Sequence, residues 1–88
     1  MVECFHALVL TGTPGVVRGR CREAFRAGEV FTVARDAGGD HPVSLTVREI
    51  RVYGRPVDEL TPVVTAELVP TGRGAGRLAA GTLLCRTA

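Results

Sequence analysis

The chain has 88 residues, enough for one small hydrophobic core and too few for a two-domain enzyme, a dinucleotide-binding fold or a TIM barrel. Hydrophobic residues make up 45% of it and charged residues 23%, a balance too apolar for intrinsic disorder. The 11 basic residues, all of them arginine, exceed the 9 acidic ones by a net charge of +2, which by itself is too small to indicate nucleic-acid binding.

Many valines, threonines, glycines and prolines favour an all-β chain with frequent turns. In chain order, the expected strands cover residues 2–10, 16–24, 30–35, 43–53, 63–69 and 82–85. The turns and loops expected between them cover residues 11–15, 25–29, 36–42, 53–56, 70–77 and 78–81. Residues 57–60 form either a short helical turn or an extended crossover. Six to seven strands at this spacing predict one domain over residues 1–88, a small antiparallel β-barrel.

The alternation of apolar residues assigns the face of each strand. In residues 2–10 both faces are largely apolar, and we expect Cys4 and His6 to point inward. A glycine within the second strand, Gly19, predicts a bend or a close approach of two backbone segments. In the long fourth strand the apolar positions change parity at Arg48 and Glu49, which predicts a β-bulge. The residues expected to line the core are Val17, Leu45, Val47, Val64, Ala66 and Leu68.

Four segments follow one another in an order typical of a known family. They are GTPGVVRGR at residues 12–20, VREIRVYGRPVDEL at 47–60, VTAEL at 64–68 and LAAGTLLC at 78–85, with Gly28-Glu29 between the first two. Together they resemble the second, β-barrel domain of translational GTPases such as elongation factor Tu, over residues 3–86. The chain contains neither lysine nor a G-x-x-x-x-G-K-[ST] loop, so no nucleotide site is expected. The resemblance implies a barrel of the kind that contacts tRNA or the ribosome.

An arginine-bearing strand face is the main candidate for binding. Arg18, Arg20 and Arg22 share one face of the second strand, with Arg26 close behind. Guanidinium groups in such a row can bind phosphates through paired hydrogen bonds. The alternative is a solvated strand face that pairs with glutamates on neighbouring strands. Tyr53, between two arginines in a turn, is a candidate for stacking on a base, or else caps the edge of the barrel.

The cysteines indicate free thiols in the core rather than a metal site or a disulfide. Cys4, Cys21 and Cys85 are odd in number and contain no C-x-x-C pair, so we expect free thiols packed in the interior. The alternative is a zinc site that includes His6, although the spacing lacks tight knuckles. The single serine, Ser44, has no base at the spacing of a catalytic triad. We therefore expect no catalytic residues, no metal and no cofactor.

The remaining expectations concern location and role. The longest uninterrupted apolar run, residues 7–10, is far shorter than the ~18–20 residues of a spanning helix. An acidic residue, Glu3, stands where a signal peptide has basic residues, so a cytoplasmic protein without membrane contact is expected. The leading hypothesis is a non-catalytic, stand-alone binding module that contacts RNA, the ribosome or a protein. The alternatives are a structural protein that assembles through its barrel edges, and a small enzyme or metal protein that uses Cys4, His6 and Cys21.

Overall fold

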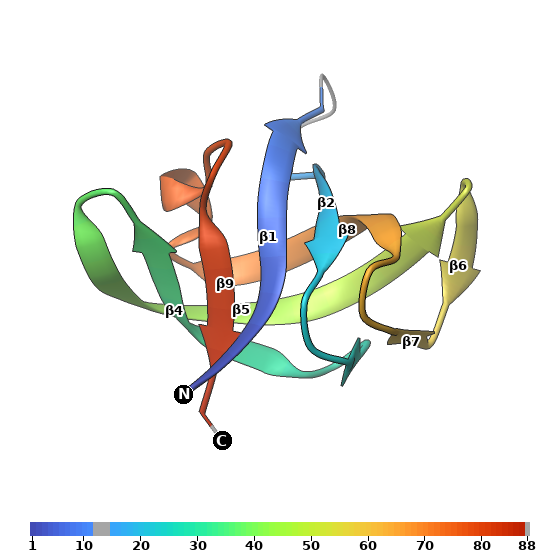
Figure 1. Cartoon of the computed structure of the whole chain (residues 1–88), viewed down its shortest axis with the longest axis horizontal. Helices are drawn as coiled ribbons and strands as arrows, with labels where there is room; N and C mark the ends of the chain where they lie inside the picture. The colour runs from blue at the N-terminus through green and yellow to red at the C-terminus, as the bar shows by residue number, and fades with distance from the viewer. Residues whose placement is uncertain (12–14, 88) are drawn as a thin grey trace.

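The computed structural model describes residues 1–11 and 15–87 and shows an all-β chain (Figure 1). The strands are β1 (Val2–Leu10), β2 (Val17–Cys21), β3 (Phe25–Arg26), β4 (Val30–Asp36), β5 (Gly39–Val52), β6 (Arg55–Val57), β7 (Glu59–Leu60), β8 (Thr65–Arg73) and β9 (Leu83–Arg86). A short 3₁₀ turn, η1 (Ala75–Arg77), follows β8. Residues 12–14, part of the first expected turn and of the GTPGVVRGR segment, lie outside the described residues.

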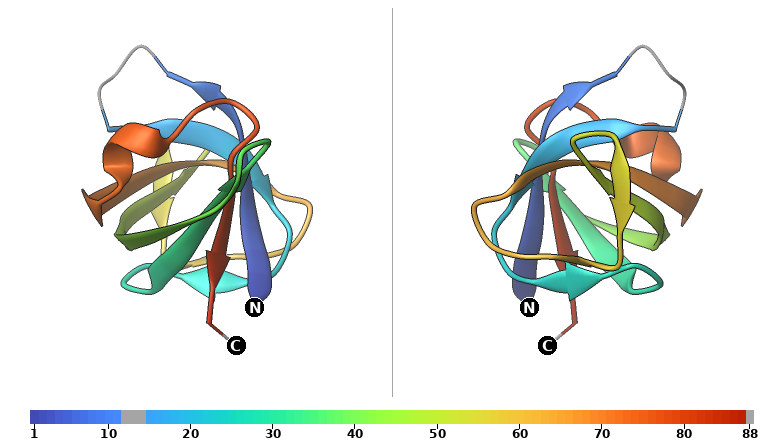
Figure 2. Two further views of the ribbon diagram at one scale, coloured as in Figure 1. Left: turned by 90° about the vertical axis from the view of Figure 1, so that its left-hand side faces the viewer. Right: turned by 90° about the vertical axis from the view of Figure 1, so that its right-hand side faces the viewer.

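Six of the strands form a closed antiparallel barrel, which confirms the predicted fold class. They pair in the order β4-β9-β1-β2-β8-β5, and β5 pairs in turn with β4 and closes the ring. β6 is an additional strand that pairs with the end of β5. β3 and β7 form a separate two-stranded ribbon below the barrel (Figure 2). In the described part of the chain, no helix is long and apolar enough to cross a bilayer.

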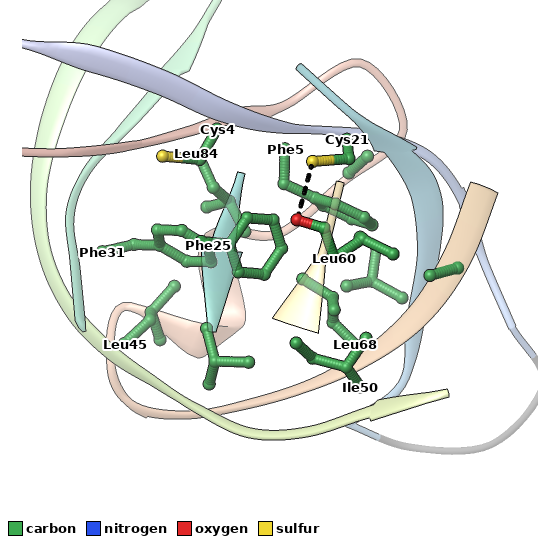
Figure 3. Close-up of a cluster of buried hydrophobic side chains, with 14 of the residues drawn as sticks. Cys4, Phe5, Cys21, Phe25, Phe31, Leu45, Ile50, Leu60, Leu68 and Leu84 are labelled. Atoms are coloured by element: carbon green, nitrogen blue, oxygen red, sulfur yellow. Dashed lines mark hydrogen bonds between the residues drawn. The ribbon is translucent and has the colours of Figure 1, made fainter. Parts of the chain in front are cut away.

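The interior of the barrel is filled by aromatic and aliphatic side chains (Figure 3). The ring of Phe25 lies between Phe5 and Phe31, at centroid distances of 6.0 Å and 5.2 Å and in edge-to-face geometry. Phe25 and Leu60 belong to the β3–β7 ribbon and are buried, so the ribbon covers the core. The expected core is confirmed for Val17, Leu45, Val47, Ala66 and Leu68, whereas Val64 is only partly buried.

Two predicted backbone irregularities are present. The register of β5 against β8 shifts between Val47 and Glu49, and Val47 and Ile50 are both buried, as a bulge at Arg48 requires. At Gly19 a Cβ atom would overlap the carbonyl oxygen of His6 and lie 2.8 Å from the ring of Phe5. Glycine at this position is therefore what allows β1 and the aromatic core to approach β2.

The predicted faces of β1 are wrong beyond Cys4. The register of β1 against β9 shifts between Glu3 and Phe5, and Cys4 and Phe5 both point into the core. This bulge exchanges the two faces, so Ala7 is buried while His6 is only half-buried and Leu8 is 42% exposed. The sequence offered no contrast here, because both faces of the strand are apolar.

Two expected loops are shorter than predicted. The polar segment 36–42 is a tight turn at Ala37 and Gly38, because the carboxylate of Asp36 accepts a 2.8 Å hydrogen bond from the Gly38 amide and β5 begins at once. The first half of the expected loop 70–77 is strand, since β8 runs to Arg73 in register with β5, and the 3₁₀ turn η1 follows. Residues 57–60 are extended, as one of the two alternatives had it.

Replacing Leu68 by Ala should lower the free energy of unfolding by roughly 2–5 kcal/mol, because Leu68 is fully buried and its loss leaves a cavity. Urea unfolding measures this cost. Thr46→Ala, on the exposed face of β5, is the control and should stay within about 0.5 kcal/mol. An unfolding midpoint unchanged by Leu68→Ala would contradict the register of β8.

The three thiols should alkylate slowly in the folded protein and completely after unfolding. Burial raises the pKa of each of them, and that of Cys21 to about 11, so little reactive thiolate forms at neutral pH. The Cys21 thiol also donates to the carbonyl oxygen of Leu60, 3.7 Å away (Figure 3). Mass spectrometry after timed iodoacetamide treatment measures the rate, and fast labelling of all three in native buffer would contradict their place in the core.

Candidate binding groove

The outer surface carries an open groove of about 670 Å³ where the sheet forks. β5 and β8 pair as far as Arg51 and Glu67; from there β5 continues beside β6 alone, and the first residues of β8 lie beside β2 alone. One wall of the groove is formed by residues 51–54 and the other by residues 63–67, with Arg18 at the apex. Figure 1 shows the β5–β6 hairpin at the right-hand edge, next to the loop that joins β7 to β8.

Tyr53 forms the rim of the first wall. Tyr53 and Gly54 make the two-residue turn between β5 and β6, with φ of 53° and 75°, and Val52 pairs with Arg55 across it. Two positive φ angles are typical of a type I′ turn, in which Asn-Gly is the preferred pair. The tyrosine is 99% exposed. It therefore does not cap the barrel edge, which was the alternative role considered for it.

Val63 forms the opposite rim and has the same kind of backbone. Its φ is 73°, and the Val64 amide donates a 3.3 Å hydrogen bond to the carbonyl of Thr61, with Pro62 and Val63 as the two central residues. A type II turn has this arrangement and normally places glycine at the position of Val63. The Val63 amide donates to the carbonyl of Cys21 at 3.0 Å, which ties the turn to the end of β2. Val63 is nevertheless 72% exposed.

The apex of the groove contains two ion pairs. Arg18 lies 3.0 Å from the carboxylate of Glu67 on the neighbouring strand. Arg51 donates two hydrogen bonds, each 3.0 Å long, to Glu49. These bonds raise the pKa of Arg51 and lower the pKa of Glu49, so both groups are charged at neutral pH. With two guanidiniums and two carboxylates, the apex is polar and close to electrically neutral.

The structure brings together some of the residues predicted to bind a partner. Arg18 and Tyr53 line the groove. Arg20 points outward from the same face of β2, next to the groove, and Arg22 follows the end of that strand. Arg26 lies on the separate β3–β7 ribbon. No observation tests whether these five residues bind anything, and their role stays a prediction.

Sequence reasoning missed Val63 and Arg51. The segment Thr61-Pro62-Val63 carried a usable signal, because proline favours the second position of a turn and the next residue then takes up the turn geometry. Arg51 could be placed only once the pairing of β5 with β8 was known. Among the described residues, no three histidine, cysteine, aspartate or glutamate side chains gather as metal ligands.

Comparison with known proteins identifies a related fold and no family. No protein-family model matches the chain, and no curated protein matches it. Among solved structures, it is similar to the C-terminal domain of a protein of Geobacillus thermoleovorans described as a U32 peptidase, with a TM-score of 0.75 over 99% of this chain and 93% of that one. The two sequences are 13% identical, so the similarity shows a shared barrel fold and no shared activity. The barrel fold that the sequence predicted is present, whereas the resemblance to translational GTPases itself is not shown.

We expect Tyr53→Asn and Val63→Gly each to leave stability unchanged or to raise it by up to about 1 kcal/mol. A large or β-branched residue in the left-handed region lowers the stability of the folded state by about 1–2 kcal/mol, and both substitutions remove this strain. In Val63→Gly, the greater freedom of glycine in the unfolded chain offsets about 0.5–1 kcal/mol of that gain in stability. Thermal unfolding measures both variants. A clear loss of stability in both would mean that the two side chains serve folding, and the groove would lose its main support as a site.

Proposed function

We propose that this domain is a non-catalytic binding module and that its binding surface is the forked groove, with a protein as the partner. The observation that carries the proposal is the pair Tyr53 and Val63. Both are exposed, both stand on opposite walls of one groove, and both occupy backbone conformations that favour glycine or asparagine. Strained backbone conformations of this kind are concentrated at functional sites, because there the residue is needed for function even though it destabilises the fold.

The chemistry of the groove supports a protein partner. Tyrosine and arginine are enriched among the residues that contribute most to protein–protein affinity. Tyr53 and Val63 supply apolar area, and Arg18 and Arg51 supply hydrogen-bond donors beside them. The two carboxylates at the apex would repel phosphate groups.

RNA or the ribosome is the second candidate, and it is favoured by a different observation. Within the described residues, Arg20 and Arg22 have no carboxylate partner. Arg20 follows Arg18 along the outer face of β2, and Arg22 comes directly after the end of that strand. Side chains on one face of a strand are about 6.6 Å apart, at ~3.3 Å per residue, which is close to the spacing of phosphates in an extended backbone. Such binding would be weak and sequence-tolerant, because the net charge of the chain is only +2.

The absence of catalysis is part of the proposal. Its support is the state of the groups that could act as nucleophiles. All three thiols are buried, and burial raises the pKa of each, which disfavours the reactive thiolate. The half-buried His41 of β5 lies 3.1 Å from Asp36 at the end of β4. Residues 51–54 and 63–67 of the groove walls contain no cysteine, histidine or serine.

The protein partner is tested by capture followed by reconstitution. Wild-type domain and the double variant Tyr53→Asn/Val63→Gly are each immobilised and exposed to nuclease-treated native lysate, and the retained protein is identified and purified. Calorimetry with the purified partner should show at least tenfold weaker binding to the double variant, since hot-spot side chains contribute about 1–2 kcal/mol or more each. Val30→Thr removes an exposed apolar group on β4 and should bind as the wild type does. Equal affinity of all three proteins would refute the groove as the site.

The RNA candidate is tested by titration. The triple variant Arg18→Ser/Arg20→Ser/Arg22→Ser should fold, because all three positions are exposed. If the strand binds phosphates, wild type should bind a generic structured RNA with an affinity that falls with salt, by roughly one counterion per contact, and the triple variant should bind more weakly. Identical, salt-independent curves for the two proteins would remove RNA as a candidate.

A further inference from the structure

We propose, on the basis of the proposed function, that the groove binds an extended polypeptide segment as an added β-strand in the fork between β5 and β8. The segment carries an apolar side chain that seats between Tyr53 and Val63 and an acidic side chain that reaches Arg20. The partner is thus identified by its conformation and by its chemistry, namely an exposed, extended stretch of another protein with alternating apolar and acidic residues.

The fork leaves two strand edges without a neighbour. By the register that pairs Arg51 with Glu67, the next partners across the fork would be Val52 with Ala66 and Tyr53 with Thr65, yet the ladder ends at Arg51. Beyond it, Val52 pairs only with Arg55 of β6, and Ala66 and Thr65 pair only with β2. An edge of this kind is a template for the addition of a strand.

The main-chain groups on one of these edges face the groove. The Cys21 amide donates to the carbonyl of Val64 at 3.0 Å, so Val64 directs its carbonyl toward β2. In an antiparallel ladder, residues bond to alternate sides, and the main chain of Thr65 therefore faces away from β2, toward the fork. A polypeptide strand offers the alternating N–H and C=O groups that match such an edge, whereas a nucleic acid offers no such ladder.

The side chains around the fork select the segment. Tyr53 and Val63 provide apolar contact on the two rims, 99% and 72% exposed respectively. Arg18 and Arg51 are already neutralised by carboxylates, whereas Arg20, opposite Thr65 in register, has no carboxylate partner among the described residues. Arg20 therefore supplies an unneutralised positive charge beside the groove, and this charge favours an acidic residue near the apolar one.

The test uses random twelve-residue peptides displayed on phage and selected on the wild-type domain, with counter-selection on Tyr53→Asn/Val63→Gly. We expect enrichment of peptides in which an aliphatic or aromatic residue lies within two positions of Asp or Glu. The strongest peptide is then synthesised with single N-methyl groups along its backbone, which remove N–H donors and keep every side chain. At least one such analogue should bind tenfold more weakly, and the amide of Thr65 should exchange with solvent at least tenfold more slowly when the unmodified peptide is bound.

The outcomes separate this inference from the proposed function. If a selected peptide requires Tyr53 and Val63 but tolerates every N-methyl group, the groove binds side chains only, strand addition is wrong and the proposed function stands. If the peptide binds the double variant as well as the wild type, the groove is not its site, and the reconstituted partner then decides the proposed function. If no peptide is enriched, the assignment to a segment of another protein is wrong. It is also wrong if light scattering shows that the wild type forms a concentration-dependent dimer and that the double variant does not.

Discussion

The pairing of β5 with three neighbours is the constraint on which the rest of the structure depends. Along its 14 residues, β5 pairs with β4 near its start, with β8 over residues 44–51 and with β6 at its end. A straight strand could not serve both sides of a small closed ring, and the bulge at Arg48 supplies the bend. Beyond Arg51, β5 pairs only with β6, while the first residues of β8 pair only with β2. The path of β5 therefore both closes the barrel and separates the two strands at the fork.

A barrel of this size leaves its interior to side chains and its function to the outer surface. Phe5, Phe25 and Phe31 occupy the centre, and the ribbon of β3 and β7 covers the core with Phe25 and Leu60. Gly19 lets β2 approach this aromatic cluster closely, so the inner wall has no room for a ligand there. What distinguishes one such barrel from another in binding is therefore its outer face and its turns, and the sequence similarity to other barrels can fall very low while the fold persists.

The sequence predicted the fold correctly where apolar and polar residues alternate clearly along a strand. The alternation of arginine with Val17 and Cys21 fixed the faces of β2, and the change of parity at Arg48 located the bulge in β5. Where both faces are apolar, as in β1, periodicity could not show that the bulge brings Cys4 and Phe5 to the same side. The groove could be predicted only in part, since Arg18 and Tyr53 stood out by residue type but the fork arises from pairings between segments distant in the chain.

The distribution of positive φ angles separates the needs of folding from those of binding. Apart from Tyr53 and Val63, every described residue with a positive φ is glycine, as at Gly28 in the turn before β4 and Gly81 in the turn before β9. Glycine therefore occupies every other described position at which the backbone requires a positive φ. At Tyr53 and Val63 a side chain is present instead, and each lowers the stability by about 1–2 kcal/mol in a domain whose total stability is on the order of 5–10 kcal/mol. Burial does not offset this destabilisation, because both side chains are exposed. The two side chains line opposite walls of one groove, and an interaction outside the folded domain is the physical reason that accounts for both.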